Sequence, residues 1–161
     1  MTNFWEELKS GKFASMVCEA AREQTASTSQ EVFNIIRPLA AIEPDIEQFW
    51  CIFMDTKNHI LAIEKLFAGS LNSTAVYPRE IIKKCLYHQA AAVVFAHNHP
   101  SGNPAPSSED FMITKRLFFA LMPIDVTIHD HVIVGNTAHY SMTGEGDINR
   151  IKISYETATN F

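Results

Sequence analysis

The sequence AAAVVFAHNHPSGNPAPSSED, residues 90–110, decides the fold. Its first seven residues are all apolar, which is typical of a strand that is buried on both faces. The next residues combine two histidines with prolines, serines and a glycine, and they lead into a helix-like segment that begins near Ser107. We therefore predict a central strand with a functional site at its end, followed by a tight loop and a helix.

Two histidines stand one residue apart at the end of this strand. Side chains alternate between faces in an extended chain, so His97 and His99 project from one side while Asn98 points away. Asp110 follows a loop rich in proline and glycine, which turns sharply and has little freedom. Two histidines and one carboxylate match the arrangement of a catalytic zinc site, with three protein ligands and a water, better than a closed structural site.

The same residues have simpler explanations. Ser107 followed three residues later by Asp110 is a helix-start pattern, and a helix cap alone would explain both residues. Histidine is a common metal ligand, but it is also tolerated at the end of a strand, so the histidine pair alone does not specify a metal. It is the combination of both histidines, the loop and the carboxylate after an apolar strand that favours a metal site.

Length and composition indicate one globular domain. The chain has 161 residues, of which 47% are hydrophobic and 19% charged, and this is an ordinary composition for a folded protein. The net charge of −5 argues against a large nucleic-acid-binding surface, which needs clustered basic residues. Arg79, Lys83 and Lys84 recur at helical spacing and form either a local basic patch or the solvated face of an amphipathic helix.

The cysteines and the N-terminus predict a soluble cytoplasmic protein. Cys18, Cys51 and Cys85 are odd in number and lack any Cys-x-x-Cys spacing, so we expect free thiols in a reducing compartment. The first residues are acidic where a secretory signal requires positive charge. No stretch approaches the ~20 apolar residues that span a bilayer, and we expect no association with a membrane.

The pattern of elements predicts an α/β fold with a mixed β-sheet and helices packed on it. We divide the chain into an N-terminal helical arm and linker (1–27), the domain (28–145) and a C-terminal tail (146–161). In chain order, the domain is predicted to contain a helix from residue 28, a hairpin of strands 48–54 and 60–67, a helix at 78–89, the central strand, a helix at 107–121, and strands within 124–134 and 138–142.

The spacing His-x-His, seven residues, Ser, two residues, Asp resembles the signature of the JAMM (JAB/MPN-type) zinc metalloproteases. The longer motif His-Asn-His-Pro-Ser-Gly followed by Pro-Ser-x-x-Asp is similar to the motif of the bacterial RadC-like branch of that family. The resemblance implies a JAB/MPN (cytidine-deaminase-like) architecture. Residues 1–27 are too few to hold the helix-hairpin-helix segment of longer family members, so we expect a short form, which argues against direct nucleic-acid binding. It covers roughly residues 28–145 and includes residues 47–50, 54–58, 69–71, 77–80 and 130–135.

The resemblance also implies a set of roles. His97, His99 and Asp110 match the ligands of Zn²⁺, and Glu47 matches the general base. Ser107 matches the residue that donates its hydroxyl to the oxygen that becomes negative during hydrolysis. The implied activity is hydrolysis of a peptide or isopeptide bond in a peptide or protein substrate.

Several alternatives stay open. Glu64 is a second candidate for the base, and Asp130 or His131 is a candidate to orient the metal ligands. A non-catalytic metal-binding module that binds protein or DNA, in DNA repair or mobile-element biology, is the alternative function. Nucleobase deaminases are rejected because the His-x-Glu and Pro-Cys-x-x-Cys signatures are absent, and non-haem iron oxygenases use a different local order of ligands. Neither the substrate nor the oligomeric state follows from the sequence.

Overall fold

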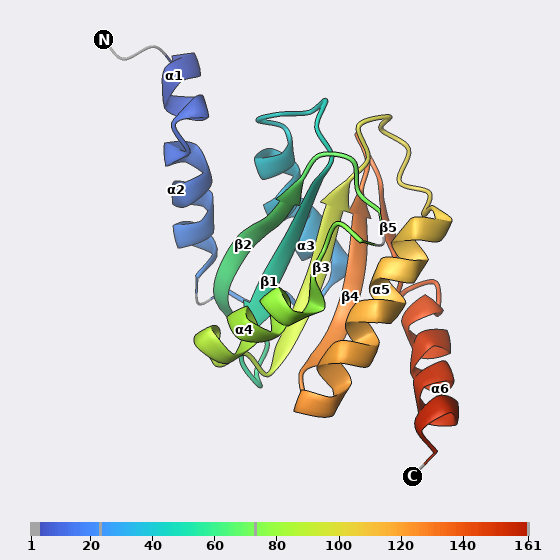
Figure 1. Cartoon of the computed structure of the whole chain (residues 1–161). Coiled ribbons are helices and arrows are strands. Elements are labelled where there is room, and N and C mark those ends of the chain that lie inside the picture. The colour runs from blue at the N-terminus through green and yellow to red at the C-terminus, as the bar shows by residue number, and fades with distance from the viewer. Residues whose placement is uncertain (1–3, 23, 73, 161) are drawn as a thin grey trace.

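The computed structural model describes residues 4–22, 24–72 and 74–160, which form a mixed five-stranded sheet with helices on both faces (Figure 1). The elements in chain order are α1 (Phe4–Lys9), α2 (Lys12–Ala21), α3 (Ser29–Ala40), β1 (Gln48–Met54), β2 (Ile60–Ala68), α4 (Pro78–His88), β3 (Ala92–Asn98), α5 (Ser108–Leu121), the 3-10 helix η1 (Met122–Ile124), β4 (Thr127–Val134), β5 (His139–Ser141) and α6 (Asp147–Thr159).

The strands lie in the order β2-β1-β3-β4-β5. β1 and β2 form the predicted antiparallel hairpin, β1 also pairs antiparallel with β3, β3 pairs parallel with β4, and β5 is antiparallel to β4. The predicted mixed sheet is therefore confirmed. β3 is the central strand, and all seven of its residues are buried, as the apolar run predicts.

Alternating side chains of the central strands divide the core between two helical layers. Phe49 and Phe95 face the side that is covered by α4, α5 and α6. Ile52 and Val94 face the opposite side, where α3 packs. Figure 1 shows α4 and α5 on one face of the sheet, α3 behind it, and α2 beside the edge strand β2. The helix on which Asp110 lies is thus held on the face of the sheet toward which His97 points, packed against β4.

The ends of the helices follow from local sequence signals. Thr28 caps α3 together with Glu31 in a reciprocal capping box, so this helix starts where the sequence predicts it. Pro38 lies inside α3, where it lacks the N–H that would bond to the carbonyl of Asn34, and the helix ends two residues later at Ala40. Gly11 separates α1 from α2 with a φ of 79°, a left-handed conformation that glycine adopts without strain.

Two segments differ from the sequence prediction. The last long strand begins at Thr127, because residues 122–124 form the 3-10 turn that ends α5. Residues 147–159 form α6, where the sequence predicts no element. Only Ile148 and Ile151 of α6 are buried, so the apolar pattern of this segment is too short to predict a helix. The helix is stabilised by packing of these two residues against the part of the core that α5 covers.

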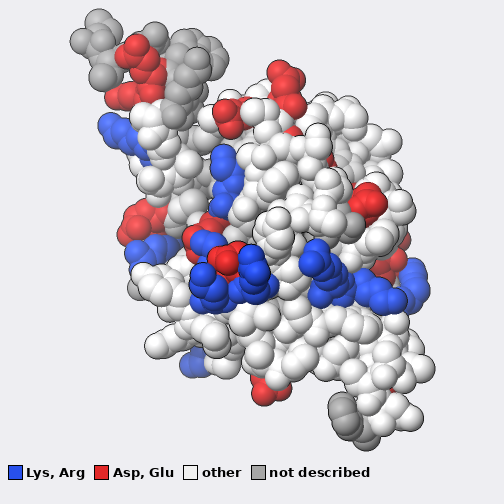
Figure 2. All heavy atoms as spheres, viewed as in Figure 1, with Lys and Arg blue, Asp and Glu red and all other residues white. Residues whose placement is uncertain are grey.

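Basic and acidic side chains alternate over the face formed by α4 and α5 (Figure 2). Arg79 and Lys83 each lie within 4.0 Å of Glu80, at 3.8 Å and 3.4 Å, and Lys84 lies 2.7 Å from Glu64. These acidic partners offset the positive charge and fit the interpretation of α4 as a solvated helix face. Among the helices of the described residues, none combines the length and apolar character needed to cross a bilayer.

Candidate metal centre

β3 positions the two histidines at one end of the sheet. Backbone pairing continues through His97, which lies opposite Phe49 of β1 and Ile133 of β4, and Asn98 still pairs with Val134. The strand therefore extends two residues beyond the predicted apolar run. His97 is 0% exposed, and its imidazole lies on the side of the sheet that faces α5.

The loop from His99 to Asp110 is fixed by a close approach of two glycines. Gly102 has a φ of 84°, and a Cβ atom at this residue would lie 2.3 Å from Nδ2 of Asn136. A Cβ atom at Gly135 would lie 2.5 Å from the carbonyl oxygen of Gly102. The Asn136 N–H donates to that same carbonyl at 3.1 Å. The loop is thus packed against the β4–β5 turn. This packing holds the loop that leads to Asp110 in one conformation, as a preorganised ligand requires.

Asp110 serves as a helix cap and as a member of the cluster at the same time. The Ser107 N–H donates to Oδ2 of Asp110 at 2.8 Å, and the Asp110 N–H donates to Oγ of Ser107 at 3.2 Å. Oδ1 of Asp110 lies 3.1 Å from Nε2 of His97, and Oδ2 lies 3.2 Å from Nε2 of His99. The simpler interpretation of this pair as a cap is therefore correct, and it does not exclude the metal site.

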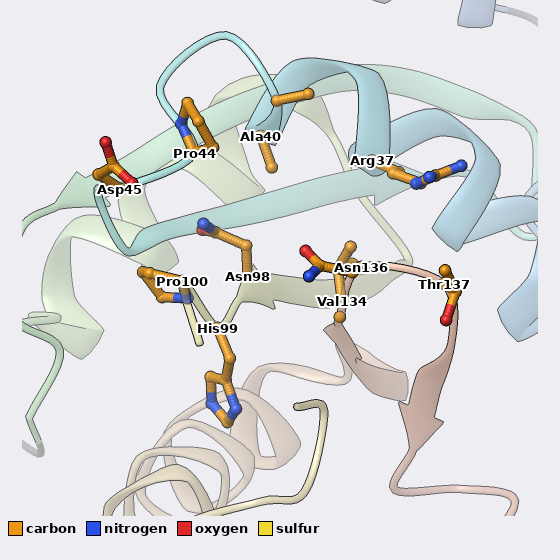
Figure 3. Close-up of a pocket in the computed structure, with 12 residues that line it drawn as sticks. Arg37, Ala40, Pro44, Asp45, Asn98, His99, Pro100, Val134, Asn136 and Thr137 are labelled. Carbon is orange, nitrogen blue, oxygen red and sulfur yellow. The ribbon is translucent and has the colours of Figure 1, made fainter. Parts of the chain in front are cut away.

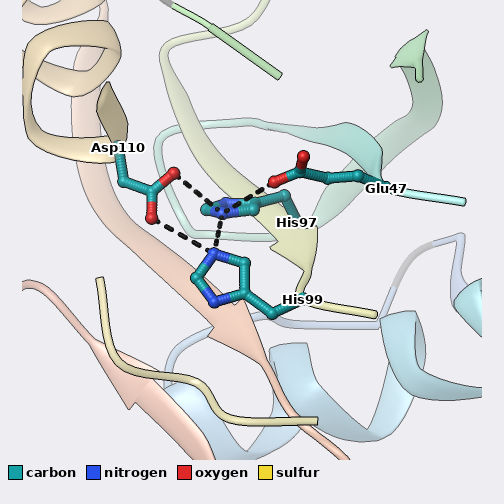
Figure 4. A group of neighbouring side chains, drawn as sticks. All are labelled: Glu47, His97, His99 and Asp110. Carbon is teal, nitrogen blue, oxygen red and sulfur yellow. Dashed lines mark hydrogen bonds and ion pairs between the residues drawn. The ribbon is translucent and has the colours of Figure 1, made fainter. Parts of the chain in front are cut away.

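Glu47, His97, His99 and Asp110 converge in one place (Figure 4). Their ligand atoms all lie within 4.8 Å of one another, with 2.9 Å between the Nε2 atoms of the two histidines. Two ligands bound tetrahedrally to zinc at about 2.0–2.1 Å lie roughly 3.3 Å apart, close to the spacing seen here. Two imidazole nitrogens and a carboxylate are also a donor set that zinc prefers. The residues therefore fit a metal ion.

The electrostatics of the cluster favour a positive charge between these groups. Burial raises the pKa of Asp110, but hydrogen bonds with His97 and His99 outweigh it and hold that pKa well below its ordinary value. The hydrogen bond to Asp110 raises the pKa of His99, although partial burial opposes this. A charged carboxylate at this position is balanced by an imidazolium or by a bound cation.

A buried chain of hydrogen bonds assigns the tautomer of His97. Oγ1 of Thr114 donates to the carbonyl of Asp110 at 2.7 Å, so its single proton is used there. Nδ1 of His131, 2.6 Å from Oγ1 of Thr114, must then be the donor. Burial lowers the pKa of His131 and keeps it neutral, so its Nε2 accepts from Nδ1 of His97 at 2.8 Å. With Nδ1 engaged in this way, Nε2 of His97 is the atom that donates to Asp110 when protonated and that would offer its lone pair to a bound cation when neutral.

His99 is oriented in the same way by the loop that follows it. Its Nδ1 donates to the carbonyl of Asn103 at 2.9 Å, so its Nε2 is the atom that faces Asp110. Both imidazoles thus present the nitrogen that a metal ion would use.

Replacing Thr114 with valine is expected to weaken metal binding. Valine has the shape of threonine but cannot accept the hydrogen bond of His131, so the tautomer of His97 is no longer imposed. Loss of such an orienting contact lowers metal affinity roughly 10–100-fold. Competition with a chromophoric chelator measures this affinity. Thr127→Val, an exposed position on β4, is the matched control, and equal affinities in the two variants would contradict the assignment.

The remaining sequence candidates have other partners. Asp130 and His131 are the two candidates to orient the metal ligands. Asp130 accepts the Thr143 N–H at 2.9 Å and anchors the turn after β5. His131 is the candidate that contacts the cluster, through Nδ1 of His97. Glu64 contacts Lys84 at 2.7 Å and His88 at 2.6 Å, and it is outside the cluster. Thr114 is not among the residues predicted from the sequence, although its position one helical turn after Asp110 is a signal that reveals it.

A cavity of about 330 Å³ lies at the same end of the sheet but on its α3 side, and the imidazole of His99 points away from it (Figure 3). It is formed between the C-terminal end of α3 and the ends of β3 and β4, and His99 is part of its wall. Its other lining residues are Arg37, Ala40, Ala41, Pro44, Asp45, Asn98, Pro100, Val134, Gly135, Asn136 and Thr137.

Comparison with known proteins gives a consistent result. The RadC-like JAB domain family matches residues 26–147. A UPF0758 protein of Pseudomonas fluorescens (strain Pf0-1) is 46% identical over 127 residues, which are 78% of this chain and 56% of the relative. The UPF0758 protein YfjY of Escherichia coli (strain K12) is 48% identical over 100 residues, 62% of each chain. The chain thus spans about half of the length of most of the relatives it matches.

Proposed function

This chain belongs to the RadC-like JAB domain family, and we propose on that basis that it is a zinc-dependent hydrolase of peptide or isopeptide bonds. The observation that carries the proposal is the position of Glu47 beside the His97, His99 and Asp110 group. A purely structural metal site needs ligands alone, whereas hydrolysis also needs a base next to them.

Glu47 is suited to act as this base. Its Oε1 lies 4.0 Å from Nε2 of His97, and its Oε2 accepts the Leu71 N–H at 3.1 Å. One carboxylate oxygen is therefore held while the other faces the cluster. The Glu47 side chain is 23% exposed, against 0% for His97 and 3% for Asp110, so the cluster opens to solvent and substrate on the Glu47 side.

The chemistry follows from these groups. Bound zinc would supply Lewis acidity that activates water for attack at neutral pH. Oε1 of Glu47 accepts a proton from the attacking water and returns it to the leaving amine. Ser107 is exposed at the start of α5 and uses its oxygen as an acceptor in the cap, so its hydroxyl hydrogen is available to the oxygen that becomes negative.

Metal analysis and activity assays together test the proposal. Protein purified without added metal is expected to contain about one zinc per chain, as one cluster of this donor type implies. A panel of fluorogenic peptides and isopeptide-linked substrates should be cleaved, with activity lost on chelation and restored by Zn²⁺. A zinc-containing protein that cleaves none of them and instead associates with protein or DNA would support the non-catalytic module.

A further inference from the structure

Asn98 stands between the two histidines in sequence but on the opposite side of the sheet. It is the last residue of β3 and is 5% exposed. Because side chains alternate along a strand, its carboxamide points away from the cluster, toward the segment that joins α3 to β1 (Figure 3). No metal-binding role is available to it from there.

The carboxamide of Asn98 bonds to the two residues that flank Glu47. Its Nδ2 donates to the carbonyl of Ile46 at 2.9 Å, and its Oδ1 accepts the Gln48 N–H at 2.7 Å. The second bond is short and buried, and it spans 50 residues of sequence. Both bonds are made to backbone atoms, so they fix the path of the chain through Glu47.

These bonds replace backbone pairing at the point where it ends. The β1–β3 register runs from Met54 opposite Ala92 to Phe49 opposite His97, and it does not include Gln48 or Glu47. On the other side of β1, the Gly69 N–H donates to the carbonyl of Glu47 at 2.8 Å. The peptide group between Glu47 and Gln48 is therefore held from both sides, by Gly69 just after β2 and by Asn98.

We infer that Asn98 is a positioning residue that couples the base Glu47 to the metal-ligand strand. The backbone of Asn98 is continuous with His97 and His99, and its side chain sets the backbone of Glu47, so the ligands and the base move as one body. The Gln48 side chain also reaches the Ile46 carbonyl, at 3.4 Å, but it belongs to the same segment as Glu47 and makes no link to β3. The catalytic part of this inference rests on the proposed function.

Asn98→Ala tests the coupling without touching a ligand or the base. Amide hydrogen exchange is the first readout, at Gln48 and at Leu71, whose N–H donates to Oε2 of Glu47. Asn98 makes no bond to Leu71, so faster exchange there reports a displaced Glu47 carboxylate. We expect exchange at both amides to become about tenfold faster than in Val94→Ala, a buried substitution on the same face of β3.

Kinetics are the second readout. We expect kcat of Asn98→Ala to fall about 100-fold, with KM and zinc content close to those of Val94→Ala, because a displacement near 1 Å is enough for such a loss. Unchanged protection of Leu71 would overturn the inference, and so would an unchanged kcat. If the unmodified protein shows no turnover, the proposed function fails while the exchange data still decide the coupling. Asn98→Ser, too short to bridge both groups, is the second variant if the alanine variant does not fold.

Discussion

Glu47→Gln is expected to lower kcat by orders of magnitude and to leave the metal content unchanged. Glutamine has the shape of glutamate and can still accept the Leu71 N–H, so the local structure should be kept. It cannot accept a proton from the attacking water at neutral pH. Loss of a general base typically costs 10²–10⁴-fold in rate, and we expect kcat to fall by about that factor. The measurement pairs kinetics on the cleaved substrate with metal analysis of the same sample.

Glu64→Gln is the matched control for this experiment. Glu64 is a carboxylate on the adjacent strand of the same hairpin, and its hydrogen bonds with Lys84 and His88 lower its pKa despite partial burial. Its substitution should leave kcat within a few-fold of the unmodified protein. A Glu47→Gln variant that retains full turnover would remove Glu47 from the mechanism, and a loss in Glu64→Gln alone would assign the base to the rival residue.

The sequence predicts the elements that have strong local signals. The run of apolar residues at 90–96 defines β3, the turn formers at 55–58 define the hairpin, and Ser107 with Asp110 defines the start of α5. Each of these signals acts within a few residues, so no knowledge of the fold is needed. α6 lacks such a signal, because its two buried isoleucines have meaning only once α5 is in place.

The site is predictable only in part, for the same reason. The spacing of His97, His99 and Asp110 is local, and the fold brings these three residues together. The choice between Glu47 and Glu64 depends on the register of the hairpin and on the Leu71 contact 24 residues away, which local patterns do not contain. The role of Asn98 likewise depends on a contact made across 50 residues. Long-range contacts of this kind orient the site.

Removal of a ligand is the second large effect. His97→Ala and Asp110→Ala are each expected to abolish stoichiometric zinc binding, because two remaining ligands hold a zinc ion poorly. Binding stabilises the folded state by about 2.7 kcal/mol when the free metal is at 100 times Kd, and each kcal/mol shifts Tm by roughly 2–4 °C in a chain of this size. Chelation should therefore lower Tm of the unmodified protein by roughly 5–11 °C and leave Tm of both variants unchanged.

Two further variants separate metal binding from the structural role of Asp110. Asp110→Asn can still accept the Ser107 N–H and preserve the cap, which contributes about 1 kcal/mol. It lacks the negative charge, so its chelator-treated Tm should stay near that of the unmodified protein while zinc affinity falls. His129→Ala removes a histidine that bonds to Asn58 outside the cluster, and it should keep full zinc content. If His97→Ala kept its full zinc content, His97 would not be a zinc ligand, and the zinc would bind at a site other than the one formed by His97, His99 and Asp110.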